Sequence, residues 1–239
     1  MPVLIPKFNA QDKSGEQLYT EGKEQAHIFF KKYLSYFSTF GDFVEIGNEL
    51  DNKFIKGAEY NGDKRSHYKM DNRSIMYYKG FAEITKLYLP NKKLIINISY
   101  IHWGFLELLE DLSFDYDLIG LHWYSDMGNV YDFGKESLNI IDFLRDRFDK
   151  KVILTEFNVR AFDKKFNSTI QKKKWLVSNY ESLFQNINCL GVIFYELFDE
   201  PDFAKMNSIN SKTEAFYGLF SKGTNSIEYI KKEYYENLD

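Results

Sequence analysis

Short apolar runs recur along the chain, and most are followed by a segment whose apolar residues have helical spacing. The runs are rich in Val, Ile, Leu and Phe, and they lie at residues 3–7, 43–48, 94–99, 118–122, 152–156 and 191–196. Continuous apolar runs of this length are typical of strands that are buried on both faces, as in a parallel sheet. Strands that alternate with helices predict an α/β protein.

The segments between the runs predict the helices. In residues 24–37 the apolar side chains, among them Phe30 and Phe37, form one stripe at helical spacing. Pro90 ends the helix predicted over residues 74–88, because proline cannot continue a helix. Ser137 is a candidate N-cap for a helix that reaches Phe148. Further helices are predicted at residues 103–109, 169–184 and 227–237.

Two architectures fit this alternation, an open doubly wound sheet and a (β/α)8 barrel. The glycine motifs of a dinucleotide fold and of a nucleotide-binding P-loop are both absent from the sequence. Polar side chains instead follow several different strands: Asn48, Glu49, Tyr100, His122, Tyr124, Glu156, Tyr195 and Glu196. Reactive groups at the carboxyl ends of several strands favour the (β/α)8 TIM-barrel type.

The barrel is expected to be incomplete, with six βα units in one domain over residues 1–239. Successive units take about 37 residues, and a complete barrel of this type has about 250. Only 42 residues precede Phe43, so the strands correspond to the third to eighth. The first two units are part of a longer gene product, are supplied by another chain or a second copy, or lie hidden in residues 57–73 or 214–221.

Composition removes several classes of function. The chain has 31 Lys and Arg against 35 Asp and Glu, so its charge of −4 favours neither nucleic acid nor anionic lipid. Its one cysteine excludes an internal disulfide, and its four scattered histidines predict no zinc site. No metal or organic cofactor is expected. No apolar run suits a membrane helix or a secretory signal. The chain as written is therefore expected to be cytoplasmic, or extracytoplasmic if it continues upstream.

Two glutamates are the strongest candidates for chemistry. Glu49 and Glu156 each follow a buried strand, and in a barrel both would point into one mouth. Two carboxyl groups in one pocket raise each other's pKa, which suits one neutral acid beside one charged nucleophile or base. Hydrolysis of a glycosidic bond uses such a pair. A lone strand-end glutamate is more often a solvated residue or a helix cap, but Asn48, His122 and Tyr124 favour a site.

Four segments resemble motifs of the clan A retaining glycoside hydrolases, in the order that the clan has them. EIGNELD at residues 45–51 resembles the fourth strand with its acid/base, and LIGLHWYSD at residues 118–126 resembles the sixth. LTEFNVR at residues 154–160 resembles the seventh strand with its nucleophile, and GVIFYELFDEP at residues 191–201 resembles the eighth. Families 5, 39 and 53 share such motifs, and the resemblance covers nearly the whole chain.

The resemblance implies a role for each site residue. Glu49 would be the acid/base and Glu156 the nucleophile. The remaining residues would bind substrate or support the nucleophile: Asn48 at the sugar 2-hydroxyl, His122 and Tyr124 at Glu156, Tyr195 as a flat platform where relatives carry tryptophan, and Glu196 at sugar hydroxyls. Trp103 and Trp123 are candidate stacking rings, and core packing is an equally good role for both.

The expected activity is therefore that of a retaining glycosidase that cleaves a β-linked oligosaccharide or polysaccharide through a covalent glycosyl-enzyme. The first alternative is a truncated, inactive relative that binds a glycan or a partner chain, since the first two strands of the clan often carry substrate-binding residues. A barrel isomerase is the last alternative, because the segment after Glu156 lacks the glycines of a phosphate site. The sugar, the linkage and the choice between endo and exo action do not follow from the sequence.

Overall fold

A computed structural model gives the structure of the protein and describes residues 1–69, 73–160, 169–196, 217, 220–222 and 229–231. The chain divides into two compact units, Met1–Gly120 and Leu121–Asp239. Each unit is described by itself. No helix among the described residues is both long enough and apolar enough to cross a membrane.

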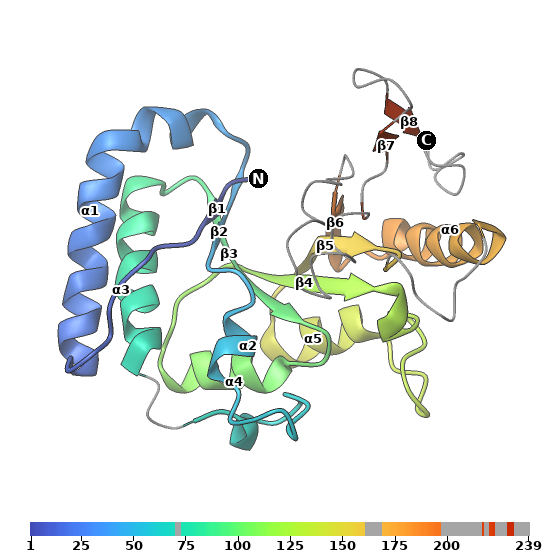
Figure 1. Cartoon of the computed structure of the whole chain (residues 1–239), viewed down its shortest axis with the longest axis horizontal. Coiled ribbons are helices and arrows are strands. Elements are labelled where there is room, and N and C mark those ends of the chain that lie inside the picture. Colours follow the sequence, from blue (N-terminus) through green and yellow to red (C-terminus); the bar gives the residue numbers. More distant parts are fainter. Residues whose placement is uncertain (70–72, 161–168, 197–216, 218–219, 223–228, 232–239) are drawn as a thin grey trace. The chain divides into compact units, whose positions relative to one another are not determined.

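The first unit alternates strands and helices along the chain (Figure 1). Its elements are β1 (Val3–Leu4), α1 (Gly15–Thr39), β2 (Phe43–Ile46), α2 (Leu50–Phe54), a 3-10 turn (Arg65–His67), α3 (Arg73–Tyr88), β3 (Lys93–Ser99), α4 (Trp103–Asp111) and the start of β4 (Leu118–Tyr124). Its core contains the side chains of Phe30, Ile46 and Ile95, which are completely buried. The strand and helix predictions are confirmed here, with shifted ends.

Helix α1 begins nine residues before the predicted start, at Gly15 rather than residue 24. Ser14 caps it, and the Ser14 side chain accepts from the backbone of Gln17 while the Gln17 side chain accepts from the backbone of Ser14. This reciprocal capping box satisfies two backbone donors that the first helical turn leaves unpaired. The Ser-x-x-Gln spacing was therefore a sequence signal for the earlier start.

Helices α1 and α3 lie side by side (Figure 1) and approach each other through two glycines. A Cβ atom on Gly22 would lie 2.1 Å from the carbonyl oxygen of Tyr77. A Cβ atom on Gly80 would lie 2.1 Å from the carbonyl oxygen of Tyr19. Because backbone atoms occupy both places, any larger side chain would push the two helices apart.

The strands form one sheet in chain order, β1-β2-β3-β4-β5-β6. β1 pairs with β2 in parallel, β2 pairs with β3 in parallel, and β5 (Val152–Asn158) pairs in parallel with β6 (Cys189–Phe194). A doubly wound sheet reverses its strand order part-way through, whereas a barrel adds each strand beside the last. The sequential order therefore agrees with the predicted barrel type and with the predicted six βα units.

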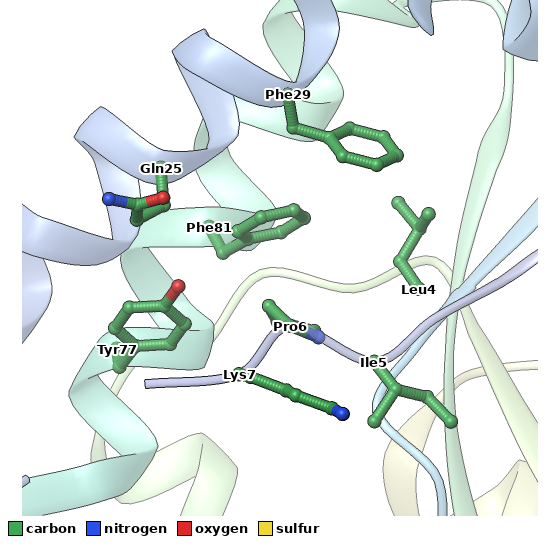
Figure 2. A pocket seen from close by; sticks show the side chains of 8 residues that line it. All are labelled: Leu4, Ile5, Pro6, Lys7, Gln25, Phe29, Tyr77 and Phe81. Atoms are coloured by element: carbon green, nitrogen blue, oxygen red, sulfur yellow. The ribbon is translucent and has the colours of Figure 1, made fainter. Parts of the chain in front are cut away.

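β1 is the first strand of the sheet, and its side chains and those of the residues after it are partly open to solvent. Val3 is 43% exposed and Ile5 is 52% exposed. The chain then runs past α1 and α3, where a cavity of about 230 Å³ is lined by residues that include Leu4, Pro6, Phe29 and Phe81 (Figure 2).

The second unit contains the rest of β4, a 3-10 turn (Ser125–Met127), α5 (Ile140–Phe148), β5, α6 (Thr169–Gln185), β6 and a small antiparallel pair, β7 (Phe220–Lys222) with β8 (Tyr229–Lys231). The ring of Phe157 on β5 stacks on Trp175 of α6 with centroids 5.0 Å apart. This contact attaches α6 to the strand that carries Glu156.

Two predictions in the second unit are wrong. Asn139, not Ser137, caps α5, and its side chain accepts hydrogen bonds from the backbone of Ile141 and Asp142. Ser137 lies in the loop before the cap with a positive φ of 52°, and so is too far from the first helical turn to cap it. Residues 229–231 form β8 instead of helix because they pair with β7; the rest of that predicted helix lies outside the described residues.

The two segments proposed to hide missing strands contain none that would extend the parallel sheet, within the part of each that the structure describes. Residues 57–69 contain one isolated bridge residue, Tyr68, which pairs with Ile55. Of residues 214–221, Phe220 and Ser221 belong to β7, which is antiparallel to β8.

Candidate functional site

Glu49 lies in a tight turn between β2 and α2. Gly47 has a φ of +80°, and a Cβ atom there would lie 2.5 Å from the Leu50 side chain. Glu49 itself has a φ of 47°, in the left-handed region, and is the N-cap residue of α2. A non-glycine residue in that region costs on the order of 1 kcal/mol and is common at functional sites. The surrounding contacts must therefore hold Glu49 in this conformation.

Those contacts come from β3 and α2. The side-chain oxygen of Asn97 on β3 accepts the Glu49 backbone N–H at 2.8 Å, and the Asn97 amide donates to the carboxylate of Glu45 on β2. Glu45 is almost completely buried, and the Asn97 amide gives its carboxylate the partner that burial requires. The amide of Asn52 donates to Oε2 of Glu49 at 3.0 Å. The turn thus fixes both the backbone and the carboxylate of Glu49.

Asp51, two residues after Glu49, is completely buried and joins the same turn to the end of β3. Its Oδ2 accepts the backbone N–H of Ser99 at 2.9 Å and lies 2.6 Å from Nδ1 of His102. Buried carboxylates need such partners because burial without them is costly. Neither Asp51 nor its contact with His102 was predicted from the sequence.

Two further predicted site residues lie in the first unit. Asn48 is half-buried directly before Glu49, and its side-chain amide makes no hydrogen bond to another residue in the described part of the chain. That amide is available for a sugar hydroxyl. Trp103 is half-buried at the first position of α4.

In the second unit, Glu156 lies on β5 with its side chain 19% exposed. The hydroxyl of Tyr124, the last residue of β4, donates to Oε2 of Glu156 at 2.5 Å. Nδ1 of His122, on the same strand, lies 3.3 Å from the same oxygen. The two predicted supporting residues are therefore both brought to Glu156, because alternate residues of β4 point to the same side.

The environment of Tyr124 favours its protonated form. Burial raises the pKa of the Tyr124 phenol well above its usual range, and the neighbouring Glu156 carboxylate adds to that rise through its charge and its hydrogen bond. Tyr124 therefore remains a hydrogen-bond donor over the whole physiological range. Such a donor orients the carboxylate and stabilises its negative charge.

Sequence reasoning missed three residues next to this pair. The guanidinium carbon of Arg160 lies 4.5 Å from the centre of the Tyr124 ring, and Nε of Arg160 lies 2.7 Å from Asp126. Nη1 of Arg160 donates to the hydroxyl of Tyr217 at 2.7 Å. Arg160 is the last residue of the LTEFNVR segment, but Tyr217 is 57 residues further along the chain and carries no local signal.

The predicted platform, Tyr195, is half-buried directly after β6. The amide of Asn158 donates to the carbonyl oxygens of Tyr195 and Tyr217, and the two tyrosine rings meet edge to face with centroids 5.9 Å apart. Glu196 is also half-buried, and its backbone N–H donates to the carbonyl oxygen of Tyr217 at 3.4 Å. The rest of this motif, residues 197–201, lies outside the described residues.

Trp123 is 0% exposed. Its ring meets Phe133 edge to face, and its indole N–H donates to the carbonyl oxygen of Gly128. Of its two proposed roles, core packing is the one that the burial supports, because a sugar cannot stack on a ring that has no accessible face.

No family model matches the sequence, and no curated protein matches it either. Solved structures do match. A psychrophilic glycoside hydrolase family 10 endo-β-1,4-xylanase has a TM-score of 0.62 at 16% identity, and the match covers 100% of this chain and 76% of that one. Xylanase 10B of Thermotoga maritima has a TM-score of 0.56 at 13% identity, covering 95% and 67%. The family 53 catalytic domain of Ignisphaera aggregans has a TM-score of 0.53 at 18% identity, covering 77% and 55%.

These likenesses decide the fold. The chain has an incomplete TIM-barrel fold. Its structural neighbours are glycoside hydrolases, so the resemblance to clan A is confirmed at the level of the fold. The chain spans 55% of the length of the family 53 catalytic domain that it matches. At identities below 20%, these matches show the fold and assign neither an activity nor a substrate.

Proposed function

We propose that the protein is a retaining glycoside hydrolase acting on a β-linked glycan. The observation that carries the proposal is the Glu156 carboxylate, which is partly exposed on the parallel strand β5, two residues before its end, and accepts a hydrogen bond of 2.5 Å from the hydroxyl of Tyr124. A carboxylate that is held in one orientation but still open to solvent is suited to attack a bound substrate. The glycosidase neighbours support the same reaction.

In the proposed reaction an oxygen of Glu156 attacks the anomeric carbon, and a covalent bond forms as the bond to the leaving oxygen breaks. Glu49 gives its proton to that leaving oxygen. Glu49 then takes a proton from water, the water oxygen attacks the anomeric carbon, and Glu156 leaves as a carboxylate. Asn48 contributes a hydrogen bond to the 2-hydroxyl. This mechanism predicts a separation of about 5–5.5 Å between the two carboxyl groups.

The first test replaces the nucleophile. The substrates are 2,4-dinitrophenyl β-glycosides of xylose, glucose, galactose and glucuronic acid, whose good leaving groups reveal weak activity. Glu156→Gln removes the nucleophilic charge with almost no change in shape, and turnover should fall at least about 1,000-fold. Glu136→Gln is the matched control, because Glu136 is an exposed residue of the same unit. Full activity in the Glu156→Gln protein would refute the proposal.

The second test replaces the acid/base. Glu49→Ala should slow substrates with poor leaving groups far more than activated aryl glycosides, since only the former need protonation. Added azide should restore turnover and give a β-glycosyl azide, because azide needs no general base. An α-glycosyl azide, or no azide product, would contradict the retaining assignment.

A second candidate function is glycan binding without turnover. It is favoured by the partly exposed apolar side chains of Val3 and Ile5 at β1, the first strand in the sheet order. Calorimetry with xylo-, galacto- and gluco-oligosaccharides separates the two functions. Saturable binding by a protein that hydrolyses none of the aryl glycosides would favour this candidate.

A further inference from the structure

Arg160 is held in one place by contacts from three directions. Its Nε lies 2.7 Å from Asp126 and its Nη1 donates to the Tyr217 hydroxyl at 2.7 Å. Its backbone N–H donates to the hydroxyl of Ser125 at 3.0 Å, and Ser125 is buried. An arginine that is anchored at side chain and backbone keeps a fixed relation to the groups around it.

The fixed guanidinium lies over the ring of Tyr124, with its central carbon 4.5 Å from the ring centre. A cation at this distance is attracted by the negative face of the ring, and the attraction grows as the pair is withdrawn from water. Tyr124 is buried, and the Arg160 side chain is only 30% exposed. The ring is therefore packed between a cation on its face and a carboxylate at its hydroxyl.

The charge of Arg160 strengthens the hydroxyl of Tyr124 as a hydrogen-bond donor. A positive charge over the ring draws electron density from the phenol, which makes the O–H a stronger donor to Glu156. The same charge lowers the pKa of Tyr124, against the larger rises caused by burial and by Glu156. Asp126, whose Oδ2 lies 2.7 Å from Nε of Arg160, is the counter-charge of that guanidinium. The three groups form a chain from Arg160 through Tyr124 to Glu156.

We propose that Arg160 is a positioning residue that acts on Glu156 through Tyr124, by fixing the ring and strengthening its hydrogen bond to the carboxylate. The catalytic part of this inference rests on the proposed function, but the coupling between the three side chains does not. The other reading of Arg160 is purely structural, as a link between the segments after β4 and β5. That reading predicts a loss of stability without a specific effect on Tyr124.

The first arm of the test is spectroscopic and needs no activity. Protein is labelled with tyrosine carrying ¹³C at Cζ, and the Tyr124 resonance is assigned by its loss in Tyr124→Phe. Arg160→Met removes the charge and keeps a flexible apolar stem, so the Tyr124 resonance should move. Arg160→Lys keeps a cation and should restore part of the native shift. Arg145→Met is the matched control, because Arg145 makes exposed ion pairs in the same unit.

The same resonance tests the step to Glu156. Glu156→Gln should also change the chemical shift of Tyr124. In the double variant Arg160→Met with Glu156→Gln, the change in shift should differ from the sum of the changes in the two single variants, since groups in one network do not act additively. Additive shifts would overturn the coupling. An unmoved Tyr124 resonance in folded Arg160→Met protein would overturn it as well.

The second arm is kinetic, on whichever aryl glycoside the native protein hydrolyses. Arg160→Met should lower kcat about 10-fold or more and keep KM within about 3-fold of the native value. The reason is that the orientation and charge of the Glu156 carboxylate matter most in the transition state. Arg160→Lys should recover part of kcat. If kcat of the folded Met variant equals that of the native protein, the positioning role is refuted while the function stands. If the native protein turns over no substrate but the chemical shift of Tyr124 still changes in Arg160→Met, the proposed function fails and the coupling stands.

Discussion

The hydroxyl of Tyr124 and the carboxylate of Glu156 are 2.5 Å apart, so the last residue of β4 contacts the candidate nucleophile on β5 through a short hydrogen bond. Burial keeps this tyrosine protonated, because the pKa of its phenol is raised far above its usual range. The donor therefore does not disappear as the pH rises through the range in which enzymes work. The relationship makes Tyr124 the supporting residue whose replacement is most informative.

Tyr124→Phe removes the hydroxyl and keeps the ring that packs against Arg160. Turnover of aryl glycosides should fall about 10- to 100-fold, because the carboxylate loses a donor whose hydrogen bond is worth about 1.5–3 kcal/mol. The thermal unfolding midpoint should change little, since the ring remains in place. Steady-state kinetics and scanning calorimetry measure the two effects. Tyr36→Phe, on the exposed surface of α1, is the control, and native kcat in Tyr124→Phe would contradict the role of the hydroxyl.

Gly22→Ala should destabilise the first unit, although alanine is the better helix former by about 1 kcal/mol. The added methyl would lie 2.1 Å from the carbonyl oxygen of Tyr77, so α1 and α3 would have to separate, which costs about 2–3 kcal/mol. Gly80→Ala should behave alike for the same reason. Urea unfolding followed by circular dichroism gives the free energies. In Gly15→Ala the new methyl meets only Met76 at 3.4 Å, and this variant should be neutral or stabilised.

Asp51→Ala should cost about 3 kcal/mol of unfolding free energy or more, because it leaves the buried N–H of Ser99 without its acceptor and removes the partner of His102. Asp51→Asn keeps one acceptor oxygen and should cost clearly less. Asp146→Ala, at a side chain that is 73% exposed, should change stability by less than about 0.5 kcal/mol. Equal stability of the Ala and Asn variants would show that the hydrogen bonds of Asp51 are unimportant.

Stability should fall in alkaline solution. Burial raises the pKa of Tyr77 from 10.0 to about 12, and it also raises the pKa of Tyr68 and Tyr116. Above pH 10 the unfolded chain releases phenolic protons that the folded chain keeps, so the stabilisation is complete below pH 10 and is lost as the pH rises. Each such group contributes a loss of about 1.4 kcal/mol per pH unit, up to about pH 12 for Tyr77.

Urea midpoints at pH 9, 10 and 11 check this prediction, with tyrosine ionisation followed by absorbance at 295 nm. Tyr77→Phe should flatten the decline above pH 10. Tyr36→Phe replaces an exposed ring and should leave the slope unchanged. A midpoint that does not move between pH 9 and 11 would argue against burial of these phenols.

The order and type of the strands could be predicted because a strand that is buried on both faces needs apolar side chains at almost every position. All six runs became strands. The ends of the elements were less secure. The caps Ser14 and Asn139 depend on local hydrogen bonds of polar side chains, and the spacing of apolar residues does not predict these bonds.

What the sequence determined by itself was therefore local: which segments are strands and helices, and which polar residues follow them. The tertiary structure alone decided that Arg160 meets Tyr217 and Tyr124, that Asp51 meets His102, and that two glycines bring α1 to α3. These partners are distant in sequence, and their pairing is fixed by how backbones pack in space. Hydrophobic patterning specifies which face of an element is buried, but not which atom of another element lies opposite.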